Sequence, residues 1–207
     1  QCDQLICLTD LLASCAELLG TRLPDNAGED SVSILPALRG TAGFLGSELN
    51  LEGAVYLGDD RLLLLQRGNG APRDGREALD ATCELSWSAL LGHLRDPQAV
   101  PPPDPTEVVQ YDLGGLGGVR LGFTDAALCP GGVLFLAVAE ASPDAVRDGP
   151  VAGVALGILG RDGSARWTAL QDREGRPFLG KAEGLSWQQD PASRVLVVLD
   201  RDDPHTP

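Results

Sequence analysis

Hydrophobic and polar positions alternate in short runs over most of the chain, and one arrangement of them occurs three times. Each copy opens on polar residues that include an acid, continues through a turn and ends in an apolar run. The opening segments are Glu52–Val55, Thr124–Ala127 and Glu183–Ser186, and the apolar runs are Leu62–Leu65, Val133–Val138 and Val195–Leu199. A unit of short strand, turn and longer strand cannot bury its own apolar faces, so we expect the copies to stack against one another.

This repeat predicts a mainly β fold. Stacked copies of one strand–turn–strand unit favour the blades of a β-propeller over a single sandwich, so we expect a partial β-propeller of about three blades. The alternative is an ordinary antiparallel sheet protein, because such proteins also contain similar strand–turn–strand units by chance.

The first part of the chain has a different pattern. Between residues 5 and 19 the apolar side chains recur about every 3.6 residues, which predicts an amphipathic helix that ends at Gly20. From Gly43 onward glycine, proline and short β-type runs dominate. We therefore expect a short α-helical N-terminal segment over residues 1–42 and the partial propeller over residues 43–207. Within the propeller part, Trp87–Leu94 predicts a short helix, and Val151–Leu159 with Arg166–Leu170 predicts a hairpin.

Composition narrows the classes of partner. The net charge of −14 argues against a nucleic acid or an anionic membrane, because both would be repelled. No apolar run has the roughly 18 residues that a membrane-spanning helix needs. The five cysteines form no CxxC pair, so they indicate neither a disulfide framework nor a zinc site. The chain begins at Gln1 and contains no methionine, so we expect it to be a piece of a longer or processed chain.

The acids that open the three copies are the candidate site. In a propeller the innermost strands surround a central channel, so we expect Glu52, Asp125 and Glu183 to lie close together there. Like charges at short distance require a proton, a basic neighbour or a cation. The candidate basic neighbours are Arg67, Arg120 and Lys181.

Two interpretations of this acidic cluster remain open. It could bind Ca²⁺ or a similar divalent cation through Glu52, Asp125 and Glu183, with Asn50 or Asn69 adding an amide oxygen. Alternatively, the acids simply accept hydrogen bonds from backbone amides and basic side chains at the mouth of the propeller. The residues expected to bind a small polar ligand are Glu52, Arg67, Asn69, Asp125, Lys181 and Glu183.

No catalytic motif accompanies this cluster. His93 and His205 have no serine or cysteine partner at a recognisable spacing. Residues 200–203 are acidic but lack the glycine and the distal glutamate of an EF-hand calcium loop. If the protein is an enzyme, we expect a hydrolase whose acidic cluster holds a metal ion that activates water.

Residues 43–207 resemble a bacterial six-bladed propeller family of unknown function, similar in style to phytase-like esterases and gluconolactonases. The matching pieces are Asn50–Ala54, Gln66–Asn69, Leu121–Asp125, Lys181–Leu185 and Asp200–Pro204. The resemblance implies a bacterial periplasmic or extracellular protein. It also implies that half of the ring is missing, so open sheet edges or a missing half-propeller would favour self-association.

Residues 1–40 resemble a C-terminal segment of an arylsulfatase. The matching pieces are Thr9–Ala13, Leu18–Gly20, Gly28–Ser31, Leu35-Pro36, Leu38 and Gly40. The family's nucleophile motif, a cysteine or serine followed by x-Pro-x-Arg, is absent, since Cys7 is followed by Leu-Thr-Asp and Cys129 by Pro-Gly-Gly. The resemblance therefore supplies an alternative function, a sulfatase fragment without its catalytic half, and a fusion of two unrelated segments is a third interpretation.

Overall fold

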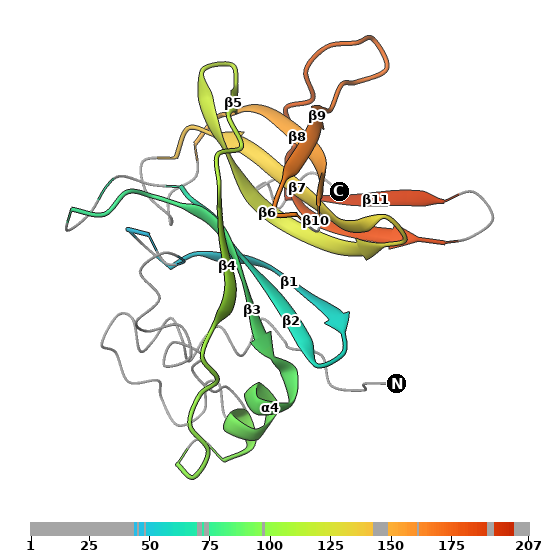
Figure 1. Cartoon of the computed structure of the whole chain (residues 1–207). Helices are drawn as coiled ribbons and strands as arrows, with labels where there is room; N and C mark the ends of the chain where they lie inside the picture. The colour runs from blue at the N-terminus through green and yellow to red at the C-terminus, as the bar shows by residue number, and fades with distance from the viewer. Residues whose placement is uncertain are drawn as a thin grey trace, which may run out of the picture.

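The computed structural model describes residues 44, 46–47, 49–69, 72, 75–96, 98–142, 149–160, 162–189 and 193–200 (Figure 1). The helix expected over residues 5–19 and the rest of the segment 1–42 lie outside the described residues. Residues 1–40, which resemble an arylsulfatase segment, therefore also lie outside the described residues.

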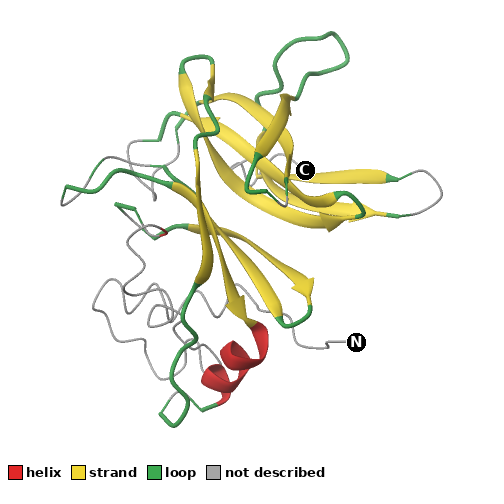
Figure 2. Cartoon of the chain, viewed as in Figure 1, coloured by secondary structure: helices red, strands yellow, loops and turns green. Residues whose placement is uncertain are grey.

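Three antiparallel sheets make up most of the described chain (Figure 2). The first contains, in spatial order, β1 (Leu51–Gly58), β2 (Arg61–Gln66), β3 (Asp80–Ser86) and β4 (Thr106–Tyr111). The second contains β5 (Gly115–Leu116), β6 (Val119–Cys129), β7 (Gly132–Glu140), β8 (Val151–Leu159) and β9 (Ala165–Ala169). The third is the hairpin of β10 (Lys181–Gln188) and β11 (Arg194–Asp200). The prediction of a mainly β fold is confirmed.

The short helix α4 (Trp87–Arg95) follows β3, where the sequence predicts it. Its first turn is capped by Ser86, whose hydroxyl accepts a hydrogen bond from the backbone N–H of Ala89 at 3.2 Å. No helix in the described ranges is both long enough and apolar enough to cross a membrane.

The inner strand β2 of the first sheet carries apolar side chains on both faces because both of its faces are covered. β2 is buried from Leu62 to Gln66, since one face meets α4 and the other meets the five-stranded sheet. The central core lies between the two larger sheets and includes Leu65, Phe123 and Phe135. A further core, which includes Leu136, Val154 and Ala182, joins the five-stranded sheet to the hairpin β10–β11.

The five-stranded sheet curls until it is a nearly closed barrel. At one edge, Trp167 of β9 donates a hydrogen bond from Nε1 to the carbonyl of Leu113, just before β5, at 2.9 Å. Leu116 of β5 packs so closely on β8 that a methyl group placed on Gly153 would lie 2.8 Å from its Cδ1. Because the two edges approach each other, the aromatic rings of Phe123 and Phe135 are enclosed and pack edge to face.

The threefold repeat corresponds to three hairpins, β1–β2, β6–β7 and β10–β11, and each hairpin has a β-bulge at the same place. The pair that closes each turn is Gly58↔Arg61, Cys129↔Gly132 or Gln188↔Arg194. When the closing pair is counted as the first, the fifth pair is Gly53↔Leu65, Asp125↔Leu136 or Gly184↔Val198, and the bulge lies between this pair and the sixth. The three hairpins belong to three different sheets, and their arrangement as propeller blades stays a prediction.

The turn of the first hairpin also touches the helix. Asp59 and Asp60 both have a left-handed backbone, with φ of 51° and 64°. The Asp60 carboxylate accepts hydrogen bonds from the backbone N–H of Ser88 and from the hydroxyls of Ser86 and Ser88. These bonds lower the pKa of Asp60 below its usual value. The turn thus holds an anion at the start of α4, where the helix dipole stabilises it.

Candidate functional site

The bulged strands of the three hairpins lie next to one another, with β6 between β1 and β10 (Figure 1). Gly53 of β1 lies so close to β6 that a methyl group placed on it would be 3.4 Å from the Ala126 nitrogen. On the other side of β6, the Asp125 carboxylate accepts a hydrogen bond from the backbone N–H of Leu185 in β10 at 2.6 Å. Residues at the three bulges are therefore brought together, although they are far apart in the sequence.

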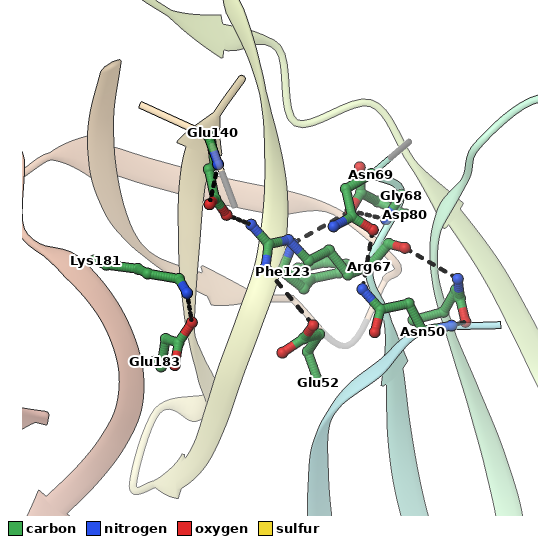
Figure 3. A network of polar contacts seen from close by, with 12 residues as sticks. Asn50, Glu52, Arg67, Gly68, Asn69, Asp80, Phe123, Glu140, Lys181 and Glu183 are labelled. Atoms are coloured by element: carbon green, nitrogen blue, oxygen red, sulfur yellow. Dashed lines mark hydrogen bonds and ion pairs between the residues drawn. The ribbon is translucent and has the colours of Figure 1, made fainter. Parts of the chain in front are cut away.

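Arg67 is the centre of this junction. It follows β2, its side chain is 6% exposed, and its guanidinium lies between two glutamates (Figure 3). Nη2 lies 2.7 Å from Oε2 of Glu140 at the end of β7, and Nη1 lies 3.6 Å from Oε1 of Glu52. Glu140 also accepts a hydrogen bond from the Gly149 backbone N–H at 2.9 Å. A buried arginine is thus held by carboxylates from two different sheets.

Glu183 and Lys181 of β10 complete the cluster on its open side. Lys181 Nζ lies 3.1 Å from Glu183 Oε1, and the Glu183 side chain is 34% exposed (Figure 3). Burial is the largest influence on Glu52 and raises its pKa above the usual value of 4.5, and the nearby negative charge of Glu183 raises it further. The Arg67 charge and a hydrogen bond from Asn50 act in the opposite direction. Two carboxylates from different hairpins therefore lie close enough to repel each other.

Two asparagines border the cluster on the side of β1. The Asn50 amide Nδ2 donates a hydrogen bond to Asn69 Oδ1 at 2.9 Å (Figure 3). The Asn50 backbone N–H donates to Gln66 Oε1 at 2.9 Å, so the start of β1 is fixed to the end of β2. Of the residues expected in the site from the sequence, the structure brings together Glu52, Arg67, Asn69, Lys181 and Glu183.

Asp80, whose side chain is fully buried, forms a second ionic centre close by (Figure 3). Its carboxylate accepts hydrogen bonds from the backbone N–H groups of Gly68 and Phe123 at 2.9 and 3.2 Å. Arg120 donates to it from Nη2 at 3.1 Å, so this expected basic neighbour serves Asp80 instead of the opening acids. Burial raises the pKa of Asp80 above its usual value, and these hydrogen bonds and charges oppose the rise. No sequence motif pointed to Asp80 or Glu140.

Asp125 does not take the place expected for it. Its two oxygens accept hydrogen bonds from the backbone N–H groups of Ala126 and Leu185, at 2.7 and 2.6 Å. In the ladder it corresponds to Gly53 and Gly184, whereas the residue that corresponds to Glu52 and Glu183 is Thr124. Aligning the three copies by their acids places Asp125 one residue away from the position that corresponds to Glu52 and Glu183. Neighbouring residues of a strand point to opposite faces of the sheet, so a shift of one residue changes the face.

Thr124 is the functional candidate that was missed from the sequence. It occupies the bulge of β6, between the strands that carry Glu52 and Glu183, and it is 2% exposed. Its hydroxyl is buried and has no hydrogen-bond partner among the described residues. Counting ladder pairs back from each turn would have identified it. A buried hydroxyl without a partner is costly, so such a group calls for a bound water or ligand atom.

A metal centre of three carboxylates is not formed by these residues. Across the described ranges, no group of three or more His, Cys, Asp or Glu side chains is placed to hold a metal ion. Asp125 is directed to backbone amides, and the carboxylates of Glu52 and Glu183 already have Arg67 and Lys181 as neighbours. The Ca²⁺ site of Glu52, Asp125 and Glu183 thus lacks its third carboxylate.

Fold and site together define a mainly β protein of three antiparallel sheets with an ionic cluster where three bulged hairpins meet. The chain belongs to a family of unknown function, DUF6910, whose model matches residues 21–204. No curated protein and no solved structure matches this chain. The match extends over both sides of the boundary expected near residue 42, and the family description supplies no activity, ligand or partner.

Proposed function

We propose that this chain is a binding module that recognises a small polar ligand with a positively charged group at the open side of the Arg67 cluster. The observation that carries the proposal is that the negative charges of Glu52 and Glu183, on two different hairpins, are near enough to repel each other, while the strand between them carries the hydroxyl of Thr124, which has no partner among the described residues. Carboxylate and hydroxyl groups on neighbouring strands are the kinds of groups that bind an ammonium group or a polyhydroxyl compound through hydrogen bonds.

The charges at the open side favour a cationic group over an anion. Arg67 is buried and its charge is matched by Glu140 at 2.7 Å, so it contributes little attraction at the surface. The more exposed charges are those of Glu52 and Glu183, with side-chain exposures of 26% and 34%, and of Lys181, at 14%. Two carboxylates against one ammonium leave a local negative charge, which attracts cations.

A divalent cation is the second candidate, and the mutual repulsion of Glu52 and Glu183 supports it. A hard ion such as Ca²⁺ takes oxygen ligands, and Glu52, Glu183 and the Thr124 hydroxyl are oxygen donors. In this version the ion would replace Lys181 as the partner of Glu183. A water-activating hydrolase site would additionally need this ion, so hydrolysis depends on the same test.

The partial propeller belongs to the same proposal. In its support, the strands of the first sheet follow one another in sequence order, as do those of the second, and the bulged strands β1, β6 and β10 of the three sheets lie next to one another with β6 in the middle. Apolar cores fill the spaces between successive sheets, as between propeller blades. A crystal structure in which β1, β6 and β10 line one channel would support this arrangement, and three sheets without a common axis would reject it.

Ligand binding is tested by thermal unfolding and calorimetry on chelator-treated protein. The probes are Ca²⁺, Mg²⁺ and a panel of small amines, amino acids and polyols at millimolar concentration. A bound probe should raise the melting temperature as its concentration rises, because it binds only the folded state. Glu52→Gln, Glu183→Gln and Thr124→Val should each abolish the shift while the unliganded protein still folds.

The exposed acid Glu174 provides the matched control, since Glu174→Gln removes a carboxylate far from the cluster and should leave the shift unchanged. No shift and no heat with any probe would reject the binding module. A shift that survives in Glu52→Gln and Glu183→Gln together would mean that the ligand binds elsewhere. The arylsulfatase alternative depends on residues 1–40, and the presence of a Cys/Ser-x-Pro-x-Arg motif upstream in the coding region would favour it.

A further inference from the structure

β11 is the edge of the third sheet, and its outer side is open in the part of the chain that the structure describes. Its strand neighbour is β10, which packs on β6 and β7 (Figure 1). The corresponding strands of the other two hairpins, β2 and β7, each have a further strand at this edge, β3 and β8. An unpaired edge presents a row of backbone donors and acceptors to another strand.

The side chains of β11 alternate strictly between two faces. Val195, Val197 and Leu199 are half-buried against the core that joins β10–β11 to the five-stranded sheet. The opposite face exposes apolar area as well, since Leu196 is 45% exposed and Val198 is 65% exposed. Arg194 and Asp200 stand at the two ends of that same exposed face.

This order is complementary to itself when the strand is reversed. If two copies of β11 pair antiparallel about an axis through Val197, Arg194 of each copy stands opposite Asp200 of the other. Leu196 then stands opposite Val198 on the same face, and Val195 opposite Leu199 on the other. A shift by two residues would place one of the two charges opposite an apolar side chain and the other beyond the paired strand, so the register centred on Val197 is favoured.

We propose that β11 is a homodimerisation edge, through which two copies of this chain join their sheets about a twofold axis at Val197. The occupant of the edge is a second copy of the chain, since the charges and apolar side chains of β11 match their own reversed order. A contact of seven residues on each side is smaller than a permanent dimer interface. We therefore expect a reversible dimer whose fraction depends on protein concentration. This inference is independent of the proposed ligand.

The test is sedimentation velocity of the full chain over a dilution series. The wild-type protein should pass from monomer to dimer as concentration rises. Arg194→Glu alone and Asp200→Lys alone each bring like charges together twice across the axis, so each should weaken dimerisation by about tenfold or more. The double variant R194E/D200K exchanges the charges and should recover the wild-type association.

Mixing the two single variants gives the sharpest result. In a mixed pair, position 194 of the R194E chain is acidic and faces the basic position 200 of the D200K chain. Asp200 of the first chain then faces Arg194 of the second, so both pairs attract and the mixture should form heterodimers although neither variant dimerises alone. Leu179→Lys is the matched control, because Leu179 is an apolar residue of similar exposure (58%) outside β11, and it should leave dimerisation unchanged.

Three outcomes would overturn the proposal. A wild-type chain that stays monomeric at all concentrations would show that a second copy does not use this edge. A mixture or double variant as weakly associated as the single variants would exclude the Arg194–Asp200 pairing. Equal loss of dimerisation in Leu179→Lys would place the contact elsewhere. Thermal melts of each variant confirm that a monomeric result comes from a folded chain.

Discussion

Asp80 and Glu52 are two carboxylates of the same junction with opposite environments. Asp80 is fully buried, and backbone N–H groups and Arg120 surround its oxygens. Glu52 is partly exposed to solvent. Its carboxylate lies 3.6 Å from the guanidinium of Arg67, which makes a shorter ion pair with Glu140. The same ionic junction thus contains Asp80, whose oxygens are surrounded by protein donors, and Glu52, whose partly exposed carboxylate can still accept a hydrogen bond from a ligand.

The largest effect that this comparison predicts is loss of stability on removing Asp80. Asp80→Ala would leave the backbone N–H groups of Gly68 and Phe123 without an acceptor and Arg120 without its anion. Each buried donor left without an acceptor costs about 1–3 kcal/mol, so the two N–H groups together predict a loss of about 2–5 kcal/mol, whereas the half-exposed Arg120 can be hydrated. Urea unfolding should show a loss of this size. Asp104→Asn, at an exposed position, should unfold like the wild type, and an equally small effect of Asp80→Ala would remove the distinction between the two acids.

Replacing Arg67 should lower stability by a comparable amount, and a second substitution at Glu140 should restore part of it. Arg67→Met leaves Glu140 as a buried carboxylate without its cation, which should cost about 3 kcal/mol of unfolding free energy. In the double variant R67M/E140L the buried charge is gone as well, so about 1–2 kcal/mol should return. A double-mutant cycle by urea unfolding measures this coupling. Strictly additive losses would mean that the 2.7 Å pair is not what holds Arg67.

Asp125 should stabilise the third sheet locally, through its hydrogen bond to β10. Asp125→Ala removes the acceptor of the Leu185 and Ala126 N–H groups and should cost about 1–3 kcal/mol. Hydrogen exchange should speed up mainly in β10, because Leu185 belongs to that strand. The control is Asp112→Ala, which removes an exposed acceptor of the Gly114 N–H and should not affect β10. Unchanged exchange of Leu185 would contradict this role.

The smallest change in unfolding free energy should come from replacing Glu52, and it should be a gain in stability instead of a loss. The folded chain raises the pKa of Glu52 above its usual 4.5, so it binds a proton more tightly than the unfolded chain does. The corresponding stability is present at low pH and is lost as pH rises through the range above 4.5. Glu52→Gln has no such loss, so relative to the wild type it should gain up to about 1 kcal/mol between about pH 4 and pH 7.

Unfolding curves of Glu52→Gln and wild type at several pH values measure this gain. Glu183→Gln should act in the same direction but less strongly, since it removes the repulsion on Glu52 but also removes the carboxylate partner of Lys181. If Glu52→Gln lost several kcal/mol at neutral pH, Glu52 would be a structural residue like Asp80, and its assignment to a binding site would be wrong.

Local pattern was sufficient to predict the apolar strands of the repeat and the helix α4, but not β3 or β5. The apolar runs predicted β2, β7 and β11, and the segment at Trp87 predicted α4, because burial of one or both faces requires these runs. The sequence did not reveal Asp80 and Glu140 as partners of arginines, because each partner lies on a distant strand. The bulge is also invisible in the sequence, because it adds a residue without any mark, so comparison of the acids aligns Asp125 with Glu52 and Glu183 although Thr124 holds the corresponding position.

The two-residue turn between β1 and β2 has a consequence for engineering. Asp59 and Asp60 share an unfavourable left-handed backbone, which glycine would adopt without strain. Glycine at position 59 should therefore make the hairpin easier to form. Glycine at position 60 would relieve the same strain but would release Ser86 and Ser88, and the helix would lose its anchor. The turn can therefore be redesigned at Asp59 but not at Asp60, although the two residues are identical and adjacent.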